Sequence, residues 1–145
     1  MIKNTALFYT CSLIEYIGRI TKDERSRVVE LLGKDVDRIY NYQDVFHCEP
    51  IEKVADDFIV RNNIPLGSFD NIASCKYTVP DYWDIGDVFA RLVEDNFAQK
   101  DSISGIKEIF RSWLVAKISN YNSDLFYQSR DYIDACYKNG EILAA

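Results

Sequence analysis

The sequence predicts an all-α protein of about seven helices packed in one compact bundle. Apolar residues recur at three- and four-residue spacing along most of the 145 residues, which is the period of a helix, and strictly alternating runs typical of strands are lacking. The composition, 48% hydrophobic and 28% charged, is that of an ordinary globular chain, and the 14% of aromatic residues favours a well-packed interior. We therefore expect one domain over residues 1–145.

The first half is expected to form a four-helix unit over residues 5–63. Its first helix spans about 5–20, with apolar side chains along one face. Thr21 and Glu24 have the spacing of a capping box, in which the two side chains accept each other's backbone N–H groups, so a second helix should begin there. Gly33 should end it, because glycine tolerates the backbone conformation of a helix C-cap.

Two further helices complete this unit. The third is expected over about 35–46. The fourth begins at Pro50, since a proline is favoured in the first turn of a helix, where its missing N–H costs nothing. Asn62, Asn63 and Pro65 should end it.

Residues 64–80 lack helical periodicity and contain two prolines and a glycine. A connection of this length without an element of its own is uncommon in a compact domain and is often functional. Its apolar residues are too frequent for a free linker, so we expect an ordered irregular segment between the two helical halves. These residues are Leu66, Phe69, Ile72, Tyr77 and Val79.

The remaining helices are expected within a C-terminal unit over 81–143. Their candidate first residues or caps are Asp81, Ser102 or Ser104, and Ser129. The middle helix should continue to Ile118 with Trp113 facing inward, and Gly140 should end the last helix.

The charge balance argues against several partners. The 17 basic and 23 acidic side chains give a net charge of −6, whereas nucleic-acid binders usually carry a basic footprint. The most basic stretch, 19–38, is nearly balanced by its own acidic residues, which leaves nucleic-acid binding as a weaker alternative. An acidic protein instead suits a basic protein partner, because complementary charge steers encounter. No apolar run is long enough to span a membrane.

The four cysteines, Cys11, Cys48, Cys75 and Cys136, form no C-x-x-C pair. Without a recognisable leader sequence before them, we expect reduced, buried cysteines in a cytoplasmic protein.

His47 is the single histidine, so any catalytic design that needs an imidazole must use it. One interpretation is a histidine that caps the end of a helix just before Pro50. The other is a base or polar binding contact that works with Asp44, three residues earlier on the same face.

The densest array of carboxylates is Asp81, Asp84 and Asp87, spaced by three along one helix face. Hard cations need several oxygens that converge on one point. Placement near the positive end of the helix dipole, and an ion pair between Asp87 and Arg91, explain the array more simply. We therefore expect neither a metal nor another cofactor, and an enzyme of unrecognised type that uses His47 or these aspartates stays the main alternative.

Aromatic residues with charged neighbours gather around the irregular segment. Phe69, Tyr77, Tyr82 and Trp83 are the candidate protein-binding residues, since such side chains dominate interface hot spots. The alternative is that these rings fill the gap between the helical halves.

Three short motifs in the first half follow one another in a familiar order. Cys11 and Glu15 match Cys-x-x-x-Glu in an apolar segment, and Val28 and Leu31 match Val-x-x-Leu. A Tyr-Asp-x-Leu-His motif is approximated by Tyr42, Asp44, Phe46 and His47, with Gln43 inserted after the tyrosine.

In this order, residues 5–63 resemble a family of short bacterial helical proteins of unknown function, often encoded beside predicted ADP-ribosyltransferase-like toxins. The second half resembles uncharacterised proteins of Firmicutes and implies no activity. The resemblance implies a non-catalytic partner protein, antitoxin-like or an accessory subunit. It leaves the partner's identity and self-association open.

Overall fold

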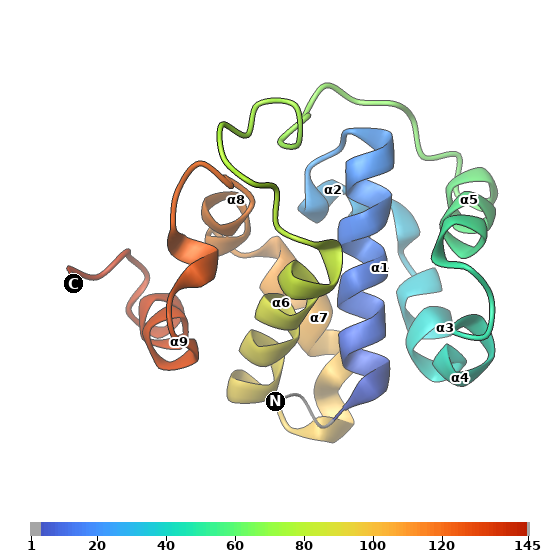
Figure 1. Ribbon diagram of the computed structural model, residues 1–145. Coiled ribbons are helices and arrows are strands. Elements are labelled where there is room, and N and C mark those ends of the chain that lie inside the picture. The colour runs from blue at the N-terminus through green and yellow to red at the C-terminus, as the bar shows by residue number, and fades with distance from the viewer. Residues whose placement is uncertain (1–3, 145) are drawn as a thin grey trace.

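The computed structural model describes residues 4–144, and every regular element in that range is a helix. The all-α prediction is therefore confirmed, although this range holds nine α-helices and two 3₁₀-helices rather than about seven helices (Figure 1). In chain order they are α1 (Thr5–Thr21), α2 (Arg25–Leu32), α3 (Asp35–Asn41), α4 (Gln43–Phe46), α5 (Ile51–Arg61), α6 (Tyr82–Asn96), η1 (Gln99–Asp101), α7 (Ser102–Arg111), α8 (Leu114–Ile118), η2 (Leu125–Tyr127) and α9 (Arg130–Asn139).

Helix α1 lies at the centre of the molecule. It packs most extensively against α6, and also contacts α2, α3, α4 and α5 (Figure 1). Residues around most of its circumference are buried, including the polar side chains of Thr10, Ser12 and Glu15. A helix buried on nearly all sides belongs to the core itself rather than to its edge. The first and second halves of the chain thus share one core.

A glycine permits the close approach of α1 and α6. A Cβ atom at Gly86 would lie 2.0 Å from Ser12 Oγ and 2.7 Å from Ser12 Cα. The Ser12 hydroxyl donates instead to the carbonyl of Phe8, 2.8 Å away, within its own helix. Only a residue without a side chain fits this helix crossing.

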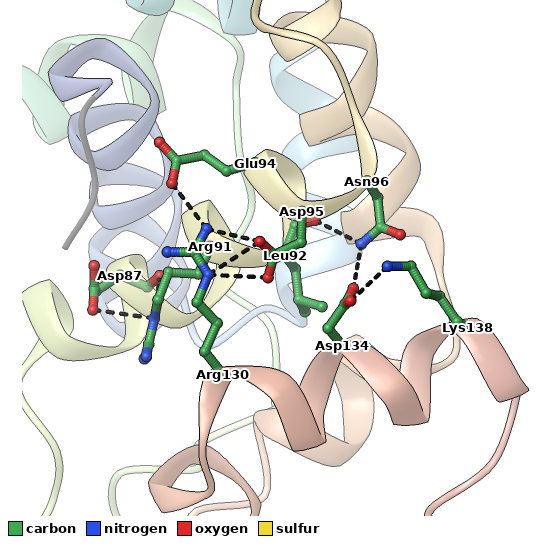
Figure 2. A network of polar contacts seen from close by, with 9 residues as sticks. All are labelled: Asp87, Arg91, Leu92, Glu94, Asp95, Asn96, Arg130, Asp134 and Lys138. Carbon is green, nitrogen blue, oxygen red and sulfur yellow. Dashed lines mark hydrogen bonds and ion pairs between the residues drawn. The ribbon is translucent and has the colours of Figure 1, made fainter.

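Polar contacts attach α9 to α6 (Figure 2). Arg130 forms ion pairs with Asp95 at 2.8 Å and with Glu94 at 3.1 Å. Asn96 donates to Asp134 over 2.8 Å. The last helix also buries Ile133 and Cys136, so apolar packing and ion pairs act together. The predicted pair between Asp87 and Arg91 also forms, at 3.3 Å, within α6 (Figure 2).

The segment over 64–80 is irregular, as predicted, and crosses the end of α1 between α5 and α6 (Figure 1). The N–H of Gly67 donates to Thr21 over 2.7 Å and that of Phe69 donates to Lys22 over 2.8 Å. Two of the apolar residues that we expected to hold the segment against the helices are not buried: Leu66 is 73% exposed and Tyr77 is 70% exposed. Backbone and amide hydrogen bonds, together with a few buried side chains, hold the segment in place.

The predicted capping box between Thr21 and Glu24 is wrong. Thr21 is the last residue of α1, and its hydroxyl donates to the carbonyl of Ile17 over 2.9 Å. Glu24 occupies the N-cap of α2 but makes no capping hydrogen bond with its side chain. Thr21 thus ends one helix instead of beginning the next, and its hydroxyl donates to a carbonyl instead of accepting an N–H.

Two predicted helices are each divided in two. The one expected over 35–46 breaks at Tyr42, which joins α3 to α4. The one expected to reach Ile118 breaks at Ser112, whose extended backbone separates α7 from α8. This break turns Trp113 outward, so its side chain is 37% exposed and the prediction that it faces inward is wrong.

Several predicted helix ends are confirmed. Asp81 caps α6 by accepting the N–H of Trp83 at 2.7 Å, and Ser129 caps α9 by accepting that of Tyr132 at 3.2 Å. Gly33 and Gly140 end their helices with φ of 53° and 74°, values that favour glycine. No helix among residues 4–144 combines the length and the apolar character needed to cross a membrane.

Candidate functional site

A chain of four aromatic rings lies across α1 and the start of α6, and we call it the aromatic cluster. Its members are Phe8, Tyr16, Tyr82 and Trp83. The ring centroids of Tyr16 and Tyr82 are 4.9 Å apart, and that of Trp83 lies 5.2 Å from Tyr82 and 5.5 Å from Phe8. All four side chains are half-buried, so each ring keeps an exposed portion.

The fold explains this arrangement. Phe8, Ser12 and Tyr16 follow one another at four-residue spacing along one stripe of α1. Ser12 sits against Gly86, and the close helix crossing there brings the first turn of α6 beside that stripe. Tyr82 and Trp83, in that first turn, thereby meet the rings of α1.

Tyr9 is a buried neighbour of the cluster. Its side chain is buried, and its ring centroid lies 6.3 Å from that of Trp83. Within residues 4–144 its hydroxyl has no hydrogen-bond partner. Burial, together with the negative charge of Glu49, raises the pKa of Tyr9 to about 12. The phenol is thus neutral at physiological pH and keeps an unused capacity to donate a hydrogen bond.

Exposed carboxylates on α5 and at the start of α6 neighbour the cluster, and we call them the acidic rim. Burial raises the pKa of Tyr16, and the charges of Glu52 and Asp56 on α5 raise it further; both of these carboxylates are exposed. Asp81, the N-cap of α6, and Asp84, in its first turn, are exposed and flank Tyr82 and Trp83 in the sequence. The rim consists of Glu52, Asp56, Asp81 and Asp84.

The structure brings together only two of the four predicted protein-binding residues. Tyr82 and Trp83 belong to the aromatic cluster, whereas Phe69 lies against Arg25, with the guanidinium carbon 5.8 Å from the ring centroid. Tyr77 is exposed in the irregular segment. Sequence reasoning missed Phe8 and Tyr16. The signal that could have found them is their spacing of eight residues, which places both on one helix face.

Asp44 and His47, the candidate polar contacts, are both exposed at α4. The ring nitrogen Nδ1 of His47 lies 3.1 Å from the backbone carbonyl of Asp44, and no contact joins the two side chains. Cys48 is also exposed, so the prediction that the cysteines are buried is wrong there, and Cys75 is half-buried. Within residues 4–144 no group of three potential metal-binding side chains gathers. Of the three aspartates spaced by three, Asp81 caps α6, Asp87 pairs with Arg91, and Asp84 is exposed.

The carboxylate of Glu15 is fully buried and ionically paired, a role that sequence reasoning did not predict for it. It receives Arg25 Nε at 2.9 Å, Arg25 Nη2 at 3.1 Å and Arg19 Nε at 2.7 Å, and the hydroxyl of Tyr121 donates to it as well. Burial raises the pKa of Glu15, but the two guanidinium groups outweigh burial and hold the pKa below its usual range.

The same network fixes distant segments of the chain. Arg25 donates to Asn71 Oδ1 over 3.0 Å, and Asn71 Nδ2 donates to the carbonyl of Ser119 over 2.9 Å. Asn71 lies in the irregular segment and Ser119 ends α8. Glu15, Arg25, Asn71 and Ser119 are buried and Arg19 is partly exposed, so the network is a structural junction among helices.

Three of the cavities lined by residues 4–144 lie away from the cluster. Two adjoin each other beside α2 and α7, with volumes of about 550 and 150 Å³, and share Ser26 and Arg111. The larger is lined by Glu30, Lys107 and Arg111, and the smaller by Glu24, Arg25 and Arg111, so each mixes one acidic with two basic side chains. A third, of about 340 Å³, lies among α8, η2 and α9.

Comparison with family models, with curated proteins and with solved structures finds no match to this chain.

Proposed function

We propose that this chain is a non-enzymatic protein-binding module and that the aromatic cluster is its binding surface. The observation that carries the proposal is the half-exposure of four mutually packed rings, which have already lost most of their side-chain freedom. A rigid aromatic surface gains apolar burial on association at little entropic cost. The occupant is a segment of another protein that lays apolar side chains on these rings.

The antitoxin-like or accessory role that the resemblance of residues 5–63 implies stays a prediction. It agrees in kind with a binding module, because such a protein acts by contact with its partner. The cytoplasmic location also stays a prediction. The buried Glu15 network supports the proposal indirectly, because its ionised side chains bind one another and stabilise the fold.

The test compares two purified variants as affinity baits in extract of the native cell. Trp83→Ser removes the central ring of the cluster, and the control Tyr127→Ser removes an aromatic side chain that is 73% exposed on η2. We expect a protein that the wild-type chain and the Tyr127 variant recover equally and that the Trp83 variant loses. Equal recovery by both variants, or recovery of no protein by the wild type, would contradict the proposal.

Because Trp83 also packs against Phe8 and Tyr9, its variant must first give the far-ultraviolet circular dichroism of the wild type. Should Trp83→Ser unfold the chain, Asp84→Trp replaces it. That substitution adds bulk at an exposed position beside the cluster without removing any packed ring, and should block the same partner.

A further inference from the structure

We infer that the partner segment is basic, and that it places arginine or lysine side chains over the aromatic cluster with their cations in the acidic rim. This inference rests on the proposed function and specifies the chemistry of its partner. It follows from the distribution of charge around the four rings.

The rim carries negative charge that no basic side chain among residues 4–144 neutralises through an ion pair. Within residues 4–144, Glu52, Asp56, Asp81 and Asp84 form no ion pair, although the same range holds ion pairs on α1, α3, α5, α6 and α9. Cations on the same helices are already engaged. Lys53 lies 2.9 Å from Glu49 and 3.3 Å from Asp57, and Arg19 lies 2.7 Å from Glu15.

The rings and the carboxylates suit one kind of side chain. The face of a tyrosine or tryptophan ring attracts a cation, and arginine does so with a planar group that also pairs with carboxylates. Arginine and lysine carry long apolar stems, which cover the exposed parts of the rings while the charged end reaches the rim. An acidic or a purely apolar segment would leave the four unpaired carboxylates repelled or desolvated without a partner.

The rings are too close together to hold a cation between them. Their centroids are 4.9 to 5.5 Å apart, so they pack on each other and present edges and faces outward. The partner's cations therefore lie over the outer surface of the cluster. This geometry predicts recognition of an extended or helical basic segment rather than of one enclosed ammonium group.

The test titrates the full chain with three short, end-blocked peptides in which leucine alternates with arginine, serine or glutamate. A Trp113→Phe background leaves Trp83 as the only tryptophan, so its fluorescence reports contact at the cluster. We expect the arginine peptide to bind at least about tenfold more tightly than the serine peptide at low salt, with a smaller margin at physiological salt. The glutamate peptide should bind weakest.

Charge-reversal variants locate the binding. Glu52→Lys with Asp56→Lys should weaken the arginine peptide at least about tenfold, because like charges across an interface repel. The control, Glu30→Lys with Glu108→Lys, makes the same change of net charge at exposed positions of α2 and α7 and should change affinity less than about twofold. An equal effect of both pairs would overturn the inference, since attraction would then follow net charge alone.

The peptides also separate this inference from the proposed function. If the serine peptide binds as tightly as the arginine peptide, and Trp83→Ser abolishes both in a calorimetric titration, the aromatic surface binds protein and the basic partner is wrong. If no peptide changes the fluorescence of Trp83, both statements are wrong.

Discussion

The residue with the largest energetic role is Glu15, whose carboxylate is fully buried between two arginines. Removing one partner of a buried ion pair leaves the other charge without compensation in a medium that solvates it poorly. The loss is larger here because Glu15 also accepts the Tyr121 hydroxyl. The junction of α1, α2, the irregular segment and the end of α8 depends on this single side chain.

We expect Glu15→Ala to lower the free energy of unfolding by about 3–5 kcal/mol, as the loss of one partner from a buried pair does. Urea unfolding measures it. The matched control is Glu94→Ala, which removes a half-exposed glutamate from its pair with Arg130 and should cost about 1 kcal/mol or less. Similar losses in the two variants would show that the buried network contributes no more than a surface pair.

The pKa of Glu15 also predicts how stability depends on pH. Its pKa is lowered in the folded chain, so the unfolded state binds a proton first as the pH falls. The stabilisation is complete above the unfolded pKa of about 4.3 and is lost as the pH falls through the lower folded value. The stability difference between the wild type and Glu15→Gln, which cannot titrate, should therefore shrink in acid. Urea unfolding from neutral pH downward checks this, and a difference that stays constant would contradict it.

At the scale of elements, the crossing of α1 and α6 determines where the aromatic cluster lies. Alanine is the better helix former by up to about 1 kcal/mol, so helix propensity alone predicts that Gly86→Ala stabilises the chain. The backbone of Ser12, 2.7 Å from the added Cβ, cannot move without separating the two helices. Sterics therefore outweigh propensity.

We expect Gly86→Ala to destabilise the chain by roughly 1–3 kcal/mol, the range for overpacking a core. It should also shift the fluorescence of Trp83, one turn away on the same helix. Thermal unfolding and emission spectra measure the two effects. The control Glu108→Ala, at an exposed position of α7, should stay within about 0.5 kcal/mol of the wild type. A stabilised Gly86→Ala would show that the helices can separate at little cost.

The contrast between local and distant contacts explains which elements the sequence predicts. Asp81 and Ser129 cap helices through bonds to residues two or three positions away, so their side chains and the following apolar period suffice to predict them. The capping prediction for Thr21 is wrong because its hydroxyl can either accept a nearby backbone N–H or donate to a nearby carbonyl. Tertiary contacts decide between these two local hydrogen bonds.

At the scale of the whole molecule, the candidate site depends on residues that the chain order separates widely. Tyr16 and Tyr82 meet because α1 and α6 pair, and Glu15 meets Tyr121 across 106 positions. No periodicity within one helix encodes either contact. The local density of aromatic residues with charged neighbours predicts Trp83 as a candidate, whereas its contacts with the rings of α1 follow only from the fold.

The central place of α1 predicts how the whole chain unfolds. Its buried faces contact helices from both halves, α6 most of all, so neither half retains a closed core without the other. We expect one cooperative transition in which the helical signal and tryptophan fluorescence change together, as in a two-state domain. The Trp113→Phe background reports on Trp83 at the shared crossing, and Trp83→Phe reports on Trp113 at α8. Midpoints that coincide in all three measurements fit a shared core, whereas an earlier midpoint for Trp113 would mean that the region around α8 unfolds separately.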